Sequence, residues 1–153
     1  MTRRAAIIDT NVVVAGLITG DDGAPTARIL DGMISGRFSF VLSVALLAEY
    51  RDVLLRDRIR AAHGLGNDEI DAILTTIASN AIIREPTIKA GSAPDSGDQH
   101  LWDLLASTPD AILVTGDRAL MGKASDSIRV VSPREFVDSP PFADRGERPT
   151  GVD

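Results

Sequence analysis

Two carboxylates in the sequence follow short apolar runs, and their positions are suited to chemistry. Asp9 follows the run Ala5–Ile8, and Asp117 follows the run Ala111–Thr115 after a single glycine. A short apolar run bounded by polar residues is typical of a buried strand in a parallel sheet. Ligands of such sheets bind beyond the carboxyl ends of the strands. The sequence therefore predicts that Asp9 and Asp117 share a binding edge, although Asp9 is equally suited to cap the next helix.

Three further acids are candidates for the same edge. Asp98 follows a polar loop and opens a helix that leads into the strand Ala111–Thr115, so it belongs to this edge. Glu49 lies inside a helix, beside the stripe that we expect to face the core, which suits either the margin of a cleft or a solvated position. Asp95 shares the loop with Asp98 and is more typical of a turn.

A cluster of these acids would favour one class of cofactor. Like charges about 4–6 Å apart repel by roughly 1–4 kcal/mol per pair at intermediate dielectric, so they take up protons or bind a cation. Carboxylate oxygens suit Mg²⁺ or Mn²⁺, and such ions assist phosphate chemistry by activating water and neutralising charge. Asn11 and Thr115 are positioned to orient the ligands or waters of such a site.

Other kinds of active site fit the sequence less well. The chain has no cysteine, so disulfides and thiolate metal sites are excluded. Neither His63 nor His100 pairs with an evident Ser or Cys nucleophile; we expect a surface role for His63 and a surface or packing role for His100, with substrate contact as the alternative. A phosphatase with an Asp nucleophile expects a second Asp two residues later, where this chain has Asn11. No glycine-rich nucleotide motif is present.

Composition indicates an ordinary globular chain with an acidic balance. Its 153 residues are 44% hydrophobic and 25% charged, which suits one domain with an aliphatic core. No apolar run is long enough to cross a membrane, and we expect a cytoplasmic protein. The net charge of −6 argues against broad electrostatic binding of nucleic acid. The net charge does not exclude a local basic rim around the acidic site, for which Arg51, Arg118 and Lys123 are candidate RNA contacts.

The alternation of apolar runs and helical patterns predicts an α/β fold with a mostly parallel sheet. The predicted strands are Ala5–Ile8, Phe38–Leu42, Ala81–Ile83, Ala111–Thr115 and Ile128–Val131. The predicted helices are Val12–Ile18, a helix from Pro25 to Gly36, Val44–Arg56, a helix capped by Asn67, a helix from Asp98, a short helix over Ala119–Lys123 and a helix from Pro133.

Caps and periodicity add detail to this scheme. Ser43 and Ser132 are expected N-caps, and Ser96 with Gln99 resembles a capping box. In the helix Val44–Arg56, the stripe expected to face the core is Val44, Leu47, Leu54 and Leu55. We expect one domain over residues 1–137 and a flexible Pro/Gly-rich tail over residues 138–153.

These pieces resemble the PIN-domain family, and most closely its VapC-like bacterial toxins from toxin–antitoxin systems. The resemblance covers about residues 4–137, and each piece is weak alone while the order of all of them is fairly specific. The matching pieces are Asp9-Thr10-Asn11, Ser43 with Glu49-Tyr50 and Val53-Leu54, Asp98, Val114-Thr115-Gly116-Asp117 and Ser132-Pro133-Arg134-Glu135-Phe136.

The resemblance implies a three-layer α/β/α fold with an Mg²⁺- or Mn²⁺-dependent endoribonuclease site. The family's acidic quartet falls on Asp9, Glu49, Asp98 and Asp117, and Thr115 matches a hydroxyl position beside it. Family toxins are commonly homodimers inhibited by an antitoxin protein. Many relatives carry adjacent acids where this chain has Gly97-Asp98, which leaves open whether Asp95 compensates and whether one or two metals bind.

The resulting hypothesis is a metal-dependent ribonuclease acting on single-stranded or loop RNA as the toxin of such a pair. One alternative is a PIN ribonuclease in RNA maturation. Expression without the neighbouring gene distinguishes the two, because a toxin should then arrest growth. The other is a non-catalytic PIN-like module that binds protein or RNA, which the complete acidic quartet argues against.

Overall fold

The computed structural model describes residues 5–87, 96–122, 129–139 and 142. The elements in chain order are β1 (Ala6–Ile8), α1 (Thr10–Ile18), α2 (Pro25–Ser35), β2 (Val41–Leu42), α3 (Val44–Leu54), α4 (Asp57–His63), α5 (Asn67–Asn80), β3 (Ile82–Ile83), η1 (Ser96–Asp98), α6 (Gln99–Ala106), β4 (Ile112–Val114), α7 (Arg118–Met121), β5 (Arg129–Val131) and α8 (Pro133–Val137). The polar loop expected before Asp98, the tail beyond residue 142 and the beginning of the last predicted strand lie outside the described residues.

The strands form a twisted parallel sheet at the centre of the molecule. β1 pairs with β4, β4 with β5 and β2 with β3, each time in parallel. A parallel bridge between Ala6 and Phe40 joins the two groups, which gives the strand order β3-β2-β1-β4-β5. The crossovers between parallel strands require intervening helices, and this explains the alternation seen in the sequence. The expected α/β fold with a mostly parallel sheet is confirmed.

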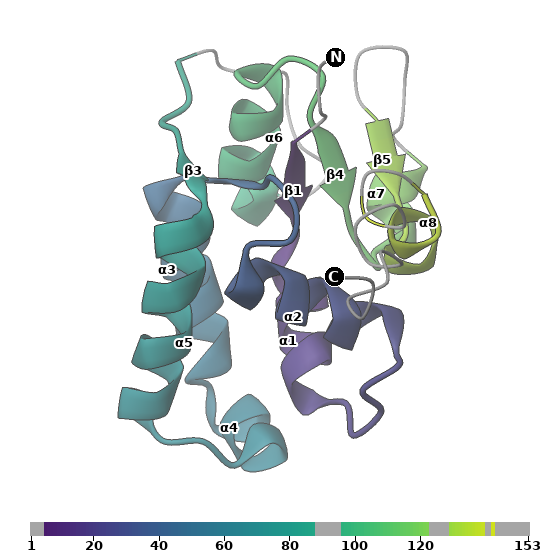
Figure 1. Ribbon diagram of the computed structural model, residues 1–153. Helices are drawn as coiled ribbons and strands as arrows, with labels where there is room; N and C mark the ends of the chain where they lie inside the picture. Colours follow the sequence, from purple (N-terminus) through teal and green to yellow (C-terminus); the bar gives the residue numbers. More distant parts are fainter. Residues whose placement is uncertain (1–4, 88–95, 123–128, 140–141, 143–153) are drawn as a thin grey trace, which may run out of the picture.

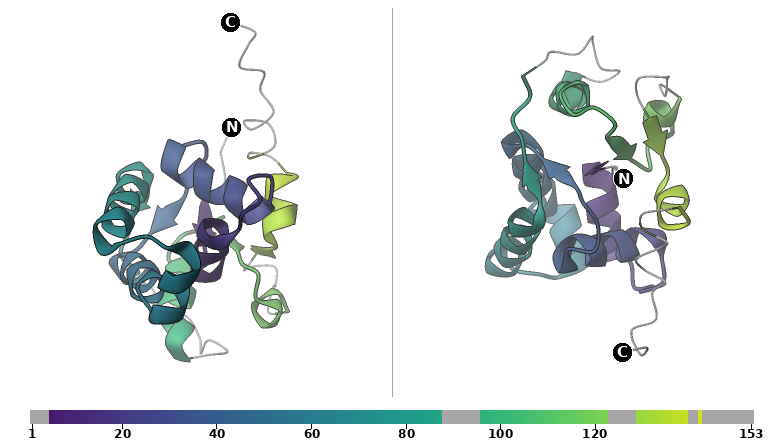
Figure 2. Two further views of the ribbon diagram at one scale, coloured as in Figure 1. Left: turned by 90° about the horizontal axis from the view of Figure 1, so that it is seen from below. Right: turned by 45° about the horizontal axis from the view of Figure 1, so that its top comes forward.

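Helices cover both faces of the sheet, as the three-layer α/β/α prediction requires. α2 packs against α5 and α8 on one face, and α3 packs against α6 on the other (Figures 1 and 2). α1 continues from the carboxyl end of β1 and contacts α2, α3 and α4. The contact between α1 and α2 is close, because a Cβ built on Gly16 would meet the Thr26 carbonyl oxygen at 2.5 Å.

Several expected boundaries shift for local reasons. α1 begins at Thr10, two residues before the expected Val12, because Asp9 already serves as its N-cap. The strand expected over Phe38–Leu42 narrows to Val41–Leu42, with Phe40 in the bridge. α4 was not predicted as a helix of its own.

Two expected caps also differ. The N-cap of α5 is Gly66, whose amide donates to Oε1 of Glu69 at 3.1 Å, and Asn67 instead accepts a hydrogen bond from Arg60. The N-cap of α6 is Asp98, where Ser96 was expected, because the 3₁₀ turn η1 precedes the helix. The predicted caps Ser43 and Ser132 are confirmed. The Ser43 hydroxyl accepts a hydrogen bond from the Leu46 amide at 3.0 Å, and the Ser132 hydroxyl accepts one from the Glu135 amide at 3.1 Å.

The core-facing stripe of α3 was predicted only in part, because Leu54 is buried as expected and Leu47 and Leu55 are partly buried against the core, but Val44 is not. Leu46, Tyr50 and Leu54 are fully buried, whereas Val44 is 64% exposed. The helix carries two apolar stripes, and the stripe at i, i+4 and i+8 faces β1 because Tyr50 reaches the strand. Its hydroxyl donates to the Ile8 carbonyl at 2.5 Å, which fixes the rotation of α3 and hence the direction of the neighbouring Glu49.

An aromatic cluster extends the core past α8. Phe142 is 1% exposed, and its ring centroid lies 5.6 Å from those of both Phe38 and Phe136. The guanidinium carbons of Arg28 and Arg37 lie 5.4 and 5.3 Å from its centroid, which suits cation–π contact. The packed core therefore includes at least one residue beyond the boundary expected at residue 137.

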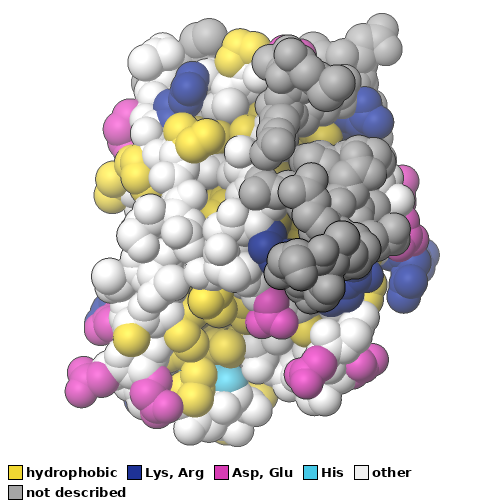
Figure 3. Space-filling view, viewed as in Figure 1, with side chains coloured by type: hydrophobic (Ala, Val, Ile, Leu, Met, Phe, Trp, Pro, Cys, Tyr) yellow, Lys and Arg dark blue, Asp and Glu magenta, His cyan; other side chains and the backbone are white. Residues whose placement is uncertain are grey.

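Exposed apolar side chains occur at several places on the surface. In Figure 3, hydrophobic side chains gather toward the lower end of the visible face, near α4, with acidic side chains around them. Among the described residues, the exposed large hydrophobic side chains are Ile18, Val44, Ile82 and Ile83. None of the described helices is both long enough and apolar enough to cross a membrane.

Candidate functional site

The site begins where β1 and β4 end side by side. Ile8 is in register with Val114, so Asp9 and Thr115 are the next residues on neighbouring strands. The Asp9 amide donates to the Val114 carbonyl at 2.9 Å, and the Thr115 hydroxyl donates to Oδ2 of Asp9 at 2.7 Å. Both side chains are buried. Strand register thus brings together two residues that are far apart in the sequence.

Asn11 completes a small network around this pair. Its Nδ2 donates to Oδ2 of Asp9 at 3.1 Å and to the Thr115 hydroxyl at 3.3 Å, while its Oδ1 accepts from the Gly116 amide at 3.1 Å. The Thr115 hydroxyl also accepts from the Asp117 amide at 3.0 Å. Asn11 and Thr115 therefore fix the direction of Asp9 and the path of the turn that carries Asp117.

Helix capping and site formation go together in this network. Asp9 is the N-cap of α1, and its Oδ1 accepts from the Thr10 amide at 2.8 Å. Asp117 is the N-cap of α7, and its Oδ1 accepts from the Ala119 amide at 2.9 Å. Each carboxylate uses one oxygen near a helix N-terminus, where negative charge is favoured. The capping interpretation of Asp9 is confirmed, and it does not compete with a role in a site.

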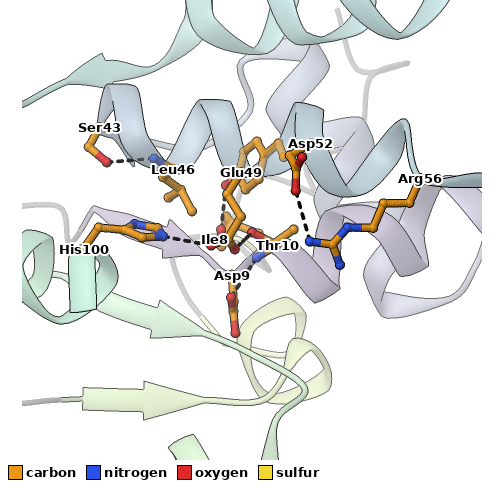
Figure 4. Close-up of polar contacts among 10 residues, drawn as sticks. Ile8, Asp9, Thr10, Ser43, Leu46, Glu49, Asp52, Arg56 and His100 are labelled. Atoms are coloured by element: carbon orange, nitrogen blue, oxygen red, sulfur yellow. Dashed lines mark hydrogen bonds and ion pairs between the residues drawn. The ribbon is translucent and has the colours of Figure 1, made fainter. Parts of the chain in front are cut away.

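Glu49 reaches this edge from α3. Its Oε2 accepts a hydrogen bond from the Thr10 hydroxyl, and its Oε1 accepts from Nε2 of His100 at 2.8 Å. Figure 4 shows Glu49 lying between His100 on α6 and Thr10 at the start of α1, with the side chains of His100 and Thr10 directed toward its carboxylate. Glu49 thus faces the edge with Asp9 and is not a freely solvated helix residue.

These acids line a single cleft of about 690 Å³. Its floor is the end of β1, and α1 and α3 form its walls. The lining residues are Asp9, Thr10, Asn11, Val14, Ala15, Ile18, Thr19, Glu49, Val53, Asp98 and Asp117. The cleft therefore contains the four acids of the predicted quartet. It also has an aliphatic wall, formed by Val14, Ile18 and Val53, which the sequence did not indicate.

The electrostatics of the cleft centre on Asp9. Burial raises the pKa of Asp9 above its ordinary value, and the charges of Glu49 and Asp117 raise it further. The hydrogen bonds from Thr115 and Thr10 act in the opposite direction and lower that pKa. Burial and the same kind of repulsion, from Asp9 and Glu49, hold the pKa of Tyr50 well above 10.0, so its hydroxyl stays a donor. The carboxylates of Glu49 and Asp117 thus act on Asp9 as nearby like charges.

The donor set of the cleft fits a hard divalent cation. All the candidate ligands are carboxylate oxygens, and a cation would relieve the repulsion that raises the pKa of Asp9. Among the described residues, no three Asp, Glu or His side chains already lie close enough together to form a ligand cage.

The other predicted site residues lie in different places. Asp95 and Lys123 lie outside the described residues. Arg51 pairs with Asp71 at 2.7 Å and lines a second groove between α3 and α5, not the acidic cleft. Arg118 is exposed and directly follows Asp117. Among the described residues that line the acidic cleft, none is basic.

Sequence reasoning missed the two partners of Glu49. Thr10 was noted only as part of the Asp-Thr-Asn turn, and His100 was assigned to the surface or to packing. The available signal was weak: His100 lies two residues after Asp98, and Thr10 directly follows Asp9. His63 has a different role, since its ring contacts the Leu54 carbonyl at 2.8 Å and the Leu65 amide at 2.9 Å, joining α3 to the end of α4.

A comparison with protein families matches the PIN domain over residues 5–119, which includes all four acids. The chain belongs to the PIN-domain family. PIN domains are generally nucleases that act on nucleic acid and use divalent metals. A search of curated proteins found no match.

Proposed function

We propose that this protein is a metal-dependent endoribonuclease that hydrolyses phosphodiester bonds in RNA. The observation that carries the proposal is the lining of one cleft by Asp9, Glu49, Asp98 and Asp117 in a chain of the PIN-domain family. Four carboxylates repel a phosphate, so RNA cannot bind at this end of the cleft without a cation. Membership in a nuclease family and this need for a cation point to the same chemistry.

Each residue has an expected task in that reaction. Asp9, Asp98 and Asp117 would hold Mg²⁺ or Mn²⁺, with Glu49 completing the shell directly or through water. When bound, such an ion supplies an acidified water and neutralises charge on the phosphate. Thr115 and Asn11 hold Asp9 in one direction through their hydrogen bonds. Arg118, which is exposed and directly follows Asp117, is a candidate contact for an RNA phosphate.

The aliphatic wall supports an unpaired RNA substrate. Val14 and Ile18 follow Thr10 at successive turns of α1, and Val53 follows Glu49 by one turn of α3. Each helix thus carries a site residue, Thr10 on α1 and Glu49 on α3, followed by an apolar residue about 6 Å further along the helix axis. A nucleotide with its phosphate at the acids would rest its base on this wall. The base pairs of a duplex would not expose that face, so we propose single-stranded or loop RNA.

We also propose a biological role for this ribonuclease, as the toxin of a toxin–antitoxin pair. The resemblance to VapC-like toxins supports a cytoplasmic toxin that acts as a homodimer and is held inactive by a cognate antitoxin protein. Induced expression without the neighbouring gene should arrest growth, and expression of the Asp9→Asn variant should not. Normal growth with active wild-type protein would favour a role in RNA maturation.

The enzymatic proposal is tested with purified protein and a mixed RNA substrate. Cleavage is expected with Mn²⁺ or Mg²⁺ and should stop with a chelator. The Asp9→Asn variant, checked for folding by circular dichroism, should lose most cleavage and most Mn²⁺ affinity. Cleavage by this variant at the wild-type rate would contradict the assignment, and a wild-type chain that binds no Mn²⁺ in calorimetry would favour a non-catalytic binding module.

A further inference from the structure

His100 makes a directed contact with one acid of the cleft. Its Nε2 lies 2.8 Å from Oε1 of Glu49, and the two side chains are 24% and 28% exposed. A carboxylate can only accept a hydrogen bond, so the histidine Nε2 must be the donor. His100 therefore belongs to the surroundings of Glu49 and not to the open surface.

The second oxygen of Glu49 is also held. The Thr10 hydroxyl donates to Oε2, so one donor comes from α1 and the other from α6 (Figure 4). Thr10 directly follows Asp9, and His100 lies two residues after Asp98. The carboxylate of Glu49 thus bridges the two segments that carry these other acids. Its position depends on both donors at once.

Within the described part of the chain, the other ring nitrogen of His100 makes no contact that would account for a histidine at this position. Nδ1 of His100 is buried and has no hydrogen-bond partner among the described residues. A buried polar nitrogen without a partner costs free energy, which an apolar side chain at this position would avoid. The contact with Glu49 is the interaction in the described structure that uses the chemistry of the ring.

We propose that His100 is a positioning residue that holds Glu49 in the geometry needed for metal binding. This inference rests on the proposed function of the cleft. Glu49 lies on the surface of α3, where an unrestrained carboxylate would sample several rotamers at an entropic cost to binding. The hydrogen bond from His100 removes that freedom and links α6, which follows Asp98, to α3. His100 acts through Glu49 and does not itself contact the metal or the RNA.

Three variants separate this role from simple packing. His100→Phe keeps a ring and removes the donor, whereas His100→Gln keeps a donor at similar reach. The matched control is His63→Phe, which removes the other histidine at a position away from the acidic cleft. Each variant is measured for Mn²⁺ affinity by calorimetry, for single-turnover RNA cleavage and for thermal melting.

His100→Phe should lower Mn²⁺ affinity by about tenfold and cleavage by about 10–100-fold, the range typical of residues that orient metal ligands. His100→Gln should restore most of both, and His63→Phe should change melting but not Mn²⁺ affinity. Because His100 acts through Glu49, adding His100→Phe to Glu49→Gln should cause little further loss.

Two outcomes would overturn the inference while leaving the proposed function intact. One is wild-type Mn²⁺ affinity and cleavage in His100→Phe. The other is fully additive losses in the double variant, which would mean that His100 acts independently of Glu49. A wild-type chain that binds no Mn²⁺ is a different result, because it would overturn the proposed function and this inference together.

Discussion

Thr115 and Asp9 lie 106 positions apart in the sequence, yet the Thr115 hydroxyl donates a 2.7 Å hydrogen bond to Oδ2 of Asp9. The same hydroxyl accepts from the Asp117 amide at 3.0 Å. One side chain therefore sets the direction of a buried carboxylate and the start of the turn that carries a second one. Burial raises the pKa of Asp9, and this hydrogen bond acts in the opposite direction by lowering it.

Replacing Thr115 tests that double role. Thr115→Val removes the hydroxyl at constant shape, and with it the hydrogen bonds to Asp9, Asn11 and the Asp117 amide. It should lower the free energy of unfolding by about 1–3 kcal/mol. Mn²⁺ affinity should fall by about 10–100-fold, as for other residues that orient ligands. Thr115→Ser keeps the hydroxyl and should stay close to wild type in calorimetry and urea unfolding. Equal behaviour of the Val and Ser variants would contradict the assignment.

The raised pKa of Asp9 predicts a pH dependence of stability in metal-free protein. Folding raises this pKa above 3.8, so the charged form destabilises the folded state at neutral pH, and the penalty disappears below pH 3.8, where both states are protonated. Relative to wild type, Asp9→Asn should therefore gain stability as the pH rises from 3 to 7. Urea unfolding in chelator across this range measures the difference.

Asp71 supplies a control of opposite sign for that experiment. The hydrogen bond and charge of Arg51 lower the pKa of Asp71, so its contribution to stability is present at neutral pH and is lost as the pH falls below 3.8. Asp71→Asn should lose stability relative to wild type as the pH rises. The effect will be small because the pair is exposed. Parallel trends for the two variants would contradict the interpretation of Asp9.

The strand ends could be predicted from the sequence, but the partners of Glu49 could not. Asp9 and Asp117 follow apolar runs directly, and strand periodicity alone places such residues at one edge of a parallel sheet. The contacts of Glu49 with Thr10 and His100 depend on how α1, α3 and α6 pack, and no local pattern encodes that packing. The buried face of α3 was not fully predicted for the same reason. The helix has two apolar stripes, and the hydrogen bond from Tyr50 to β1 determines which of them faces the core.

Tyr50 is the only tyrosine in the chain, which makes its ionisation directly observable. Burial and the charges of Asp9 and Glu49 hold its pKa well above 10.0 in the folded state. The unfolded state ionises first, so the stability contributed by this group is present below about pH 10 and is lost as the pH rises above it. The tyrosinate absorbance should therefore appear together with loss of the circular dichroism signal. Gradual ionisation in a folded protein would contradict the burial of its hydroxyl.

The aliphatic wall predicts where RNA binding can be weakened without loss of metal. Val53→Asn should reduce affinity for single-stranded RNA by about tenfold, equivalent to about 1.4 kcal/mol, because a base would lose an apolar contact. Mn²⁺ affinity should not change. The control is Val44→Asn on the same helix, since Val44 lines the other groove. Fluorescence anisotropy with Mn²⁺ and a non-hydrolysable single-stranded RNA analogue avoids cleavage while keeping the acidic residues intact. Equal effects of both variants would argue against the wall as a base site.

The burial of Phe142 predicts that the stable body of the protein includes this residue. Phe142→Ala should lower the free energy of unfolding by about 3–5 kcal/mol, as for other buried Phe side chains. Ile83→Ala, at a side chain that is 52% exposed, should cost far less. Urea unfolding of both variants measures the difference, and a small effect at Phe142 would support the domain boundary predicted at residue 137.

The register between β1 and β4 has a consequence for folding as well as for the site. Asp9 near the start of the chain and the turn with Asp117 become neighbours only when these two strands pair. An ion held by both would act as a reversible cross-link that closes most of the chain into a loop and stabilises the folded state by mass action. Release of that ion on heating would therefore coincide with the separation of β1 from β4.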